Sequence, residues 1–255
     1  MNRKVVVIGG GPAGIEAAKA AGAAGATVTM VSDSAVGGRA GWHSLLPSKV
    51  WLTAADVSGL FGQREEVGLF ADAVGADPNL IVHRIKVVKE TWQAHQVSGL
   101  RDLGVEIVTG VGSFVGPNDV NVTDSNGEMI ARLHPDATII AGGSVPFFPE
   151  KLRPDGKRVL APRFASHIAG LPASVVVIGA GATGSETVYM FNRLGVDVTW
   201  IVDQYGVLPT FDKAAGEFLA ETLAKRQVTI VSDLLADHID RGDEGVTVVL
   251  SDGSE

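Results

Sequence analysis

The sequence predicts an α/β protein with parallel central sheets, and three observations lead to this fold class. The segment Lys4–Asp33 recurs as Ser174–Asp203, 170 residues further along the chain. Each copy reads as a β-branched run, a glycine-rich turn, a run of helix formers and a second β-branched run. With 45% hydrophobic and 20% charged residues over 255 positions, the chain has enough apolar material for real cores. The 170-residue spacing is too long for a solenoid, so two copies of one supersecondary unit are expected.

The elements of the two copies follow from these runs. In the first copy we expect a buried strand at Val5–Ile8, a helix at Ile15–Ala24 that ends at Gly25, and a strand at Thr27–Val31. In the second copy the corresponding segments are Val175–Ile178, Ser185–Leu194 with Gly195, and Val198–Val202. Uninterrupted β-branched runs are typical of parallel strands that are buried on both faces.

Further elements are expected between and after the two copies. Between them the pattern predicts a long helix at Leu80–Leu103 and a strand at Val105–Val108. A hairpin is expected from Val120–Val122 and Met129–Leu133, which flank the turn residues Asp124-Ser125-Asn126-Gly127. Another buried strand is expected at Ala137–Ala141. The hairpin region is a small β meander. After the second copy we expect a helix and three strands, at Lys213–Lys225, Val228–Val231, Leu235–Asp240 and Val246–Leu250.

These elements predict two domains joined by a linker. Residues 1–150 form the first domain, the proline-rich stretch 151–172 the linker, and 173–255 the second domain. The last strand is followed only by Asp252-Gly253-Ser254-Glu255, whereas a doubly wound half would add another parallel strand. We therefore expect the second domain to be incomplete at its C-terminal end.

Composition excludes several classes of function. The formal charge is −8 and no basic stripe occurs, so a nucleic-acid partner is not expected. The chain has no cysteine, which excludes disulfides, thiolate metal sites, cysteine nucleophiles and a redox dithiol within it. Its six histidines lack metal-ligand spacing, so no metal site is expected.

The chain also shows no membrane or secretory pattern. No stretch long enough to cross a membrane lacks charged residues. The N-terminus resembles a signal peptide only superficially, because its apolar run Val5–Ile8 is short and Glu16 and Lys19 follow soon after. We expect a cytoplasmic protein, since an acidic chain without disulfides is most simply cytosolic.

The glycine turns are the clearest candidate binding sites. The pattern Gly-x-Gly-x-x-Gly between a strand and a helix places backbone N–H groups and a helix N-terminus where a pyrophosphate can bind. The alternative is a glycine turn that only lets helix and strand pack, but two copies in the same context favour two Rossmann-like dinucleotide-binding domains. The candidate residues are Gly9, Gly11, Pro12, Ala13 and Gly14 in the first copy, and Gly179, Gly181, Ala182, Thr183 and Gly184 in the second.

An acid follows each second strand. Asp33 and Asp203 are candidates for hydrogen bonds to ribose hydroxyls, although each lies one place past the expected position, which Ser32 and Val202 occupy. The alternative for each acid is a solvated turn residue. Since Val202-Asp203-Gln204 offers no cation for a 2′-phosphate, the second domain is expected to prefer NAD over NADP.

A longer pattern then identifies a family. The segment Val36–Lys49 reads VGGRAGWHSLLPSK, and together with the first glycine motif it resembles the flavoprotein disulfide reductases: dihydrolipoamide dehydrogenase, glutathione reductase and mercuric reductase. The resemblance continues through Gly110-Val111-Gly112-Ser113-Phe114 and Ala141-Gly142-Gly143-Ser144. In that family the first segment carries the redox dithiol, but Ala40 and Leu45 occupy the two cysteine positions here.

The resemblance implies cofactors and a pair of reactive-site residues. It implies FAD in the first domain, with contacts from Gly38, Arg39, Val111, Gly112, Ala141, Gly142 and Gly143. It also implies that Lys49 pairs with Glu186 beside the flavin, where a buried lysine would stabilise negative charge. The alternative for Lys49 is a surface lysine, and His43 is either a proton donor or a packing residue.

The sequence thus predicts an FAD-dependent oxidoreductase that takes hydride from NADH and passes electrons to a small-molecule acceptor other than a disulfide. Alternatives are a nucleotide-binding or redox-sensing module without turnover, and a fragment or subunit that needs a C-terminal partner. A homodimer is also compatible with the resemblance. The identity of the acceptor is not encoded in any motif.

Overall fold

The computed structural model describes residues 2–69, 75–168 and 170–255. The chain divides into two compact units: Met1–Pro47 with Ile85–Pro146, and Ser48–Arg84 with Phe147–Glu255. Each unit contains a parallel sheet with helices, so the expected α/β fold class is confirmed. The expected domain boundaries place Ser48–Arg84 with the first domain, whereas its contacts group it with the second unit.

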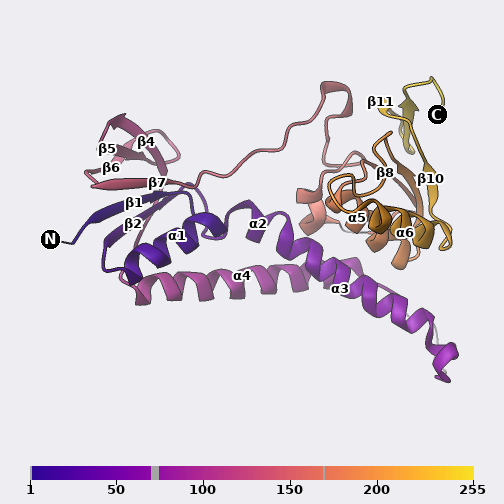
Figure 1. Cartoon of the computed structure of the whole chain (residues 1–255), viewed down its shortest axis with the longest axis horizontal. Helices are drawn as coiled ribbons and strands as arrows, with labels where there is room; N and C mark the ends of the chain where they lie inside the picture. The colour runs from indigo at the N-terminus through magenta and orange to yellow at the C-terminus, as the bar shows by residue number, and fades with distance from the viewer. Residues whose placement is uncertain (1, 70–74, 169) are drawn as a thin grey trace. The chain divides into compact units, whose positions relative to one another are not determined.

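The first unit is built on a four-stranded parallel sheet. Its strands lie in the order β3-β2-β1-β7, with bounds Glu106–Thr109, Thr27–Ser32, Lys4–Ile8 and Ala137–Ile140. Figure 1 shows helix α1 (Pro12–Ala23) and the long helix α4 (Pro78–Asp102) on one face of this sheet. An antiparallel sheet of β4 (Val111–Gly116), β5 (Asp119–Thr123) and β6 (Met129–Leu133) covers the other face.

Alternation along β1 explains the two cores of this unit. Val7 points to the helical side, where it packs with Ile15 of α1, Met30 of β2 and Leu100 of α4. Its neighbour Val6 points to the opposite side and packs with residues of β2 and β5, namely Val31 and Val122. Successive side chains of a strand point to opposite faces, so an uninterrupted β-branched run supplies both cores.

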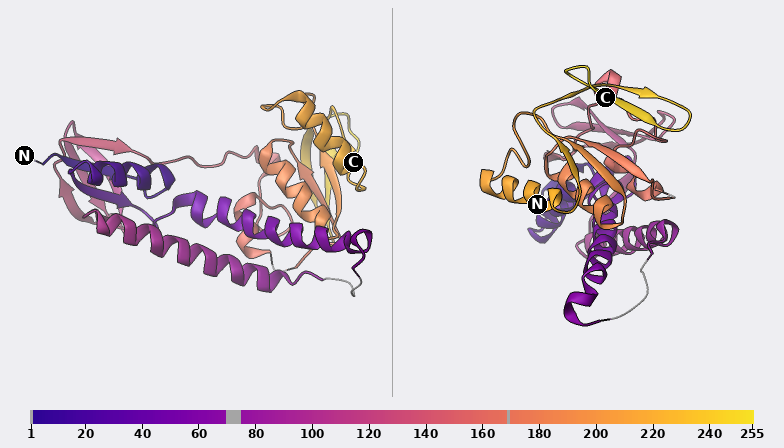
Figure 2. Two further views of the ribbon diagram at one scale, coloured as in Figure 1. Left: turned by 60° about the horizontal axis from the view of Figure 1, so that its bottom comes forward. Right: turned by 90° about the vertical axis from the view of Figure 1, so that its right-hand side faces the viewer.

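The second unit repeats the strand–turn–helix plan. Strands β8 (Ser174–Ile178), β9 (Asp197–Ile201) and β10 (Thr229–Val231) form a parallel sheet in the order β10-β9-β8. Helix α5 (Ala182–Arg193) joins β8 to β9, and α6 (Lys213–Ala224) precedes β10. An antiparallel hairpin of β11 (Ala236–Arg241) and β12 (Val246–Leu250) follows (Figure 2).

The remaining elements are helical. They are the short α2 (Gly38–Trp42), α3 (Leu45–Gly62), and the 3₁₀ turns η1 (Arg64–Val67), η2 (Glu150–Leu152) and η3 (Pro162–His167). No helix among the described residues is both long and apolar enough to cross a membrane.

Three sequence expectations about these elements are wrong. Helices α1 and α5 begin at Pro12 and Ala182, three residues before their expected starts, because the last glycine of each turn is already helical. The segment Val111–Gly116 is a strand that the sequence did not predict as one.

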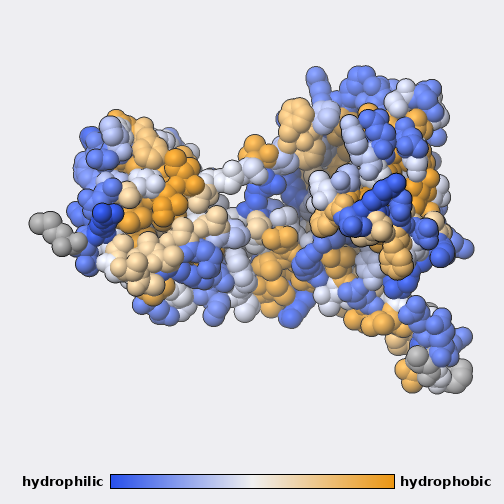
Figure 3. All heavy atoms as spheres, viewed as in Figure 1, coloured by the Kyte–Doolittle hydropathy of each residue, from blue (hydrophilic) through white to orange (hydrophobic). Residues whose placement is uncertain are grey.

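The third correction concerns two strands that were expected to be buried. Strands β7 and β8 each pair on one side only in the described chain, so they form sheet edges. In addition, Ile140 is 72% exposed and Ile178 is 40% exposed. Figure 3 shows apolar side chains gathered on the surface of the first unit in this region.

Gly14→Ala tests the packing of the first unit. A Cβ at Gly14 would lie 1.8 Å from the carbonyl oxygen of Gly9, which is backbone and cannot move aside. We expect a loss of about 1–3 kcal/mol in the free energy of unfolding, measured by urea denaturation. The control is Gly99→Ala in α4, where a Cβ meets only the end of the Lys19 side chain at 3.9 Å. That change should raise stability by roughly 0.5–1 kcal/mol through helix propensity, and equal effects would contradict the packing argument.

Candidate functional site

Both glycine turns bring a helix N-terminus close to the end of a strand. Gly9 and Gly179 have φ angles of +116° and +101°, which favour glycine. A Cβ at Gly184 would lie 2.0 Å from the carbonyl oxygen of Gly179, which repeats the Gly14–Gly9 contact in the second unit. A Cβ at Gly9 would lie 2.1 Å from the carbonyl oxygen of Ala141. The first turn is therefore packed directly against the end of β7.

No side chain caps the helix N-termini at these two turns. Gly11 and Gly181 are the N-cap residues of α1 and α5, and neither helix has a side-chain cap or an acid in its first turn. By contrast, α6 is capped by Asp212, whose carboxylate accepts a hydrogen bond from the Ala214 N–H at 2.9 Å. Uncapped N–H groups and the positive end of the helix dipole suit an anion, and the glycines leave room for it. Both turns therefore fit the pyrophosphate of a dinucleotide.

At the ends of β2 and β9, one residue is buried and the acid that follows it is accessible to solvent. Ser32 is buried and its hydroxyl donates to the Ser34 carbonyl at 2.9 Å, while Val202 is also buried. Asp33 is exposed and accepts a hydrogen bond from the Ser34 hydroxyl at 3.0 Å. Asp203 is half-buried and accepts one from the Tyr205 N–H, also at 3.0 Å. Both carboxylates thus lie at the carboxyl ends of parallel strands, the edge where such sheets bind ligands.

The segment around α2 packs against the first turn. Gly38 has a φ of +55°, and a Cβ there would lie 2.7 Å from the Cα of Gly11. The Arg39 guanidinium donates to the carbonyl of Ser144, which links this segment to the Ala141–Ser144 turn. The sequence-predicted residues Gly9, Gly11, Gly38, Arg39 and Ala141 therefore meet in one place.

The other predicted FAD contacts of the first unit lie at the ends of strands. The N–H of Gly110 donates to the Ser32 carbonyl at 2.8 Å, so β4 starts beside the end of β2. Val111 is 48% exposed there, and a Cβ at Gly112 would contact the Ile8 side chain at 3.3 Å. Gly142 and Gly143 follow β7 and are exposed.

Sequence reasoning missed the side chains that hold the α2 segment. The Trp42 indole N–H donates to the Val36 carbonyl at 3.0 Å, and the Lys89 ammonium donates to the Trp42 carbonyl at 3.3 Å. Lys89 also lies 5.4 Å from the centre of the Trp42 ring, and burial lowers the pKa of this lysine. A Cβ at Gly37 or Gly41 would meet the Trp92 ring at 2.7 and 2.6 Å, so Trp92 covers both glycines. The sequence could have indicated that Lys89 and Trp92 lie on the same face of a helix, because they are three residues apart.

The positions that carry the dithiol in the related family are held by inert side chains. Ala40 is half-buried in α2, and Leu45, at the start of α3, is 54% exposed. His43 is exposed between these helices. No group of three or more His, Asp or Glu side chains within residues 2–69, 75–168 and 170–255 could hold a metal ion.

In the second unit, α3 and α5 are joined by a ladder of polar contacts. Lys49 forms a hydrogen-bonded ion pair with Glu186, so the predicted pairing of these two residues is present. Further along both helices, the Tyr189 hydroxyl donates to the Asp56 carboxylate at 2.7 Å. The Arg193 guanidinium comes next and lies over Gly59, where a Cβ would fall 2.6 Å from its Cζ. Contacts in the same order along both helices mean that α3 and α5 run parallel (Figure 2).

The Lys49–Glu186 pair is more open than the sequence suggested. The Lys49 side chain is 53% exposed and that of Glu186 is 39% exposed, whereas a buried lysine was expected. Exposed ion pairs contribute about 0–1 kcal/mol to folding. The pair therefore adds little to stability, and both charged groups are accessible.

Comparison with known proteins identifies the family. The family model described as pyridine nucleotide-disulphide oxidoreductase matches residues 3–255. The chain belongs to this family. A dihydrolipoyl dehydrogenase of Acholeplasma laidlawii is 32% identical over 99% of this chain and 74% of its own length. An NAD(P)H dehydrogenase (quinone) of Mycobacterium tuberculosis is 29% identical over 99% of this chain and 53% of its own length.

A solved structure shows the same architecture. The crystal structure of LpdA from Mycobacterium tuberculosis superposes with a TM-score of 0.92 and 28% identity, covering 99% of this chain and 56% of that one. Two Rossmann-like folds are thereby confirmed. The chain spans about half the length of most of these relatives. Members of this oxidoreductase family use FAD and a pyridine nucleotide, so the expected pair of cofactors is confirmed at family level.

The α3–α5 ladder predicts unequal effects on stability. Tyr189→Phe removes a hydrogen bond to a carboxylate and should lower the free energy of unfolding by about 0.5–1.5 kcal/mol. A double-mutant cycle with Asp56→Ala, followed by urea denaturation, isolates that interaction. Tyr205→Phe is the control, because Tyr205 is 71% exposed and should be neutral. Lys49→Met should cost less than about 1 kcal/mol, and a larger loss would show that the ion pair is a main stabilising contact.

Proposed function

We propose that this chain supplies the FAD and nicotinamide sites of a cytoplasmic oxidoreductase that takes hydride from NADH and reduces a small-molecule acceptor other than a disulfide. The observation that carries the proposal is the replacement of both dithiol positions by Ala40 and Leu45 in a chain with no cysteine. Without a thiolate the chain cannot form a mixed disulfide with a substrate. The relative named NAD(P)H dehydrogenase (quinone) supports an acceptor of this kind.

The proposal assigns one cofactor to each unit. FAD would bind at the first glycine turn, at the α2 segment and at the strand ends near Ala141 and Val111. The nicotinamide dinucleotide would bind at Gly179–Gly184, with Asp203 toward the ribose. Since a carboxylate repels a 2′-phosphate and no Arg or Lys lies among Val202, Asp203 and Gln204, NADH is the proposed donor. FAD supplies the redox chemistry when bound, and the protein supplies position and charge.

Lys49 and Glu186 are the proposed catalytic residues. An ammonium group stabilises negative charge that develops during reduction, and a carboxylate keeps that group protonated. Asp56 and Tyr189 act as positioning residues, because their hydrogen bond fixes α3 along α5 two turns beyond the ion pair. Both side chains of the ion pair are accessible enough to interact with a bound molecule.

We also propose that a further polypeptide segment covers β7 or β8, either from a complementing C-terminal chain or from a second copy of this chain. Both strands have an unpaired edge in the described chain, and Ile139 and Ile140 of β7 are exposed. An exposed apolar edge strand is a surface on which another strand pairs.

The acceptor is tested with pure protein reconstituted with FAD. We expect NADH to be oxidised faster than NADPH with a benzoquinone as acceptor, measured by absorbance loss at the nicotinamide band. No turnover is expected with lipoamide or glutathione disulfide, because no thiolate is available. Disulfide turnover would overturn the proposal. A protein that binds no FAD, or that binds it without reduction by NADH, would instead indicate a nucleotide-binding module.

Lys49→Met tests the assigned catalytic charge. We expect flavin reduction by NADH to slow by tenfold or more while NADH affinity changes little, because the charge matters mainly as reduction proceeds. Stopped-flow absorbance gives the rate, and its dependence on NADH concentration gives the affinity. Glu186→Gln should show a milder form of the same defect, and Lys213→Met, a change at an exposed position of α6, is the control. Unchanged reduction in Lys49→Met would mean that the ion pair has no catalytic role.

A further inference from the structure

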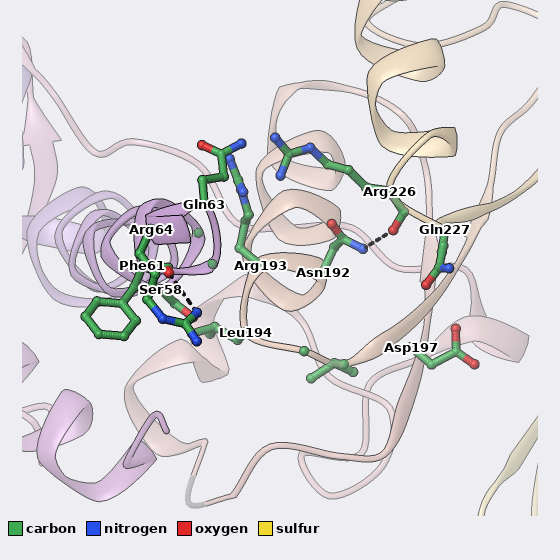
Figure 4. A pocket seen from close by; sticks show the side chains of 14 residues that line it. Ser58, Phe61, Gln63, Arg64, Asn192, Arg193, Leu194, Asp197, Arg226 and Gln227 are labelled. Atoms are coloured by element: carbon green, nitrogen blue, oxygen red, sulfur yellow. Dashed lines mark hydrogen bonds between the residues drawn. The ribbon is translucent and has the colours of Figure 1, made fainter. Parts of the chain in front are cut away.

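The second unit contains an open hollow of about 910 Å³ (Figure 4). It lies at the C-terminal ends of α3 and α5, beside the segment that connects α6 to β10. Its lining includes residues from the last turn of α3, the α5–β9 turn and the segment after α6. Helix α5 has 12 residues and is therefore about 18 Å long, which separates this hollow from the Gly179–Gly184 turn at the other end of the helix. The hollow is thus distinct from the proposed dinucleotide site.

The hollow is cationic although the whole chain is acidic. Its lining holds three arginines and one carboxylate, that of Asp197, in a chain of net charge −8. Arg64 pairs with Glu65 at 3.4 Å and stacks on the Phe61 ring. Neither Arg193 nor Arg226 forms an ion pair with any carboxylate in the described part of the chain, and Figure 4 shows Asp197 on the far side of the hollow from Arg193. Two cations are therefore available to an anion.

Arg193 is held in place by packing, and its Nε–H donor is unsatisfied. Its guanidinium lies over Gly59, where a glycine leaves the necessary space, and 5.4 Å from the centre of the Tyr189 ring. Its Nε is buried and has no hydrogen-bond acceptor among the described residues. An arginine that served only to cap a helix C-terminus would donate to the last carbonyls. Arg193 is instead fixed by packing, and one of its donors is left without an acceptor.

Neighbouring groups complete the hollow. The Asn192 amide donates to the Arg226 backbone carbonyl at 3.0 Å, which ties the end of α5 to the segment after α6. In Figure 4 the side chains of Arg193 and Arg226 extend toward the same side, with Gln63 next to Arg193. Polar amides and apolar side chains such as Leu194 line the rest.

We propose that this hollow binds a small organic phosphate, with Arg193 and Arg226 holding the phosphate group. Guanidinium groups match phosphate oxygens with paired, charge-assisted hydrogen bonds. A volume of 910 Å³ is far larger than a phosphate ion and lies within the range of small-molecule sites. The organic part of the ligand would contact the amide side chains of Gln63 and Gln227. This site is independent of the proposed redox function.

The test is a titration of the full chain with inorganic phosphate, at constant ionic strength maintained with chloride, followed by NMR of backbone amides and arginine Nε–H groups. We expect saturable shifts of the Arg193 Nε–H and of the amides of Gly195 and Val196. Arg226→Gln should weaken phosphate binding about tenfold, which corresponds to about 1.4 kcal/mol. The matched control is Lys213→Gln, which removes an equal charge from a site on α6 outside the hollow and should leave the affinity unchanged.

Two results would overturn the proposal. Shifts confined to Gly179–Gly184 would place phosphate binding at the dinucleotide turn instead. Equal weakening by Arg226→Gln and Lys213→Gln would mean that phosphate responds only to overall charge. Two variants test the assignment of the arginines, since Arg193→Gln and Arg226→Gln should each weaken phosphate binding. In both variants the backbone amide spectrum outside the hollow should remain that of the folded chain. Neither measurement requires FAD or NADH, so failure here leaves the proposed redox function untouched.

Discussion

In each glycine turn, the last glycine packs directly against the first glycine, and both candidate cofactor sites depend on this contact. Only a residue without a side chain lets a helix start directly against the end of a strand, as Gly14 does on Gly9 and Gly184 on Gly179. That contact fixes the direction of α1 and α5 and leaves their N-termini open. The absence of a capping side chain, in contrast to Asp212 on α6, keeps these backbone donors free for a phosphate.

The surrounding segments add polar groups at the same edge of each sheet. In the first unit, Gly38, Arg39 and the Ala141–Ser144 turn all contact one another or the glycine turn. In the second unit, Asp203 lies two residues after the end of β9. Parallel strands end together, so residues that are distant in sequence meet at their carboxyl ends. The same geometry explains why the segments that follow β1, β2, β3 and β7 all bear candidate contacts.

Helix α3 carries the charged Lys49 in a chain that has no thiol. Leu45 opens the helix where the related family has a cysteine, yet Lys49, one turn later, still pairs with Glu186. The pair is too exposed to matter much for folding. What holds α3 along α5 is a set of contacts, with Tyr189 and Asp56 in the middle and Arg193 over Gly59 at the end. The contacts that stabilise the packing of α3 on α5 are therefore separate from the accessible ion pair.

The sequence by itself determined the repeated strand–turn–helix units, the glycine turns, the hairpin around Asp124 and the absence of a dithiol. These features are local, since β-branched runs and Gly-x-Gly-x-x-Gly spacing act within a few residues. It also predicted the Lys49–Glu186 pair, because the family resemblance aligned two positions far apart in the chain. Only the tertiary structure decided the rest. Whether β7 and β8 are central or edge strands depends on which strands pair with them, and the exposure of Lys49 depends on how α3 packs on α5. The contacts of Trp42, Lys89 and Trp92 that hold α2, and the cationic hollow at Arg193, likewise form only where segments that are distant in sequence meet.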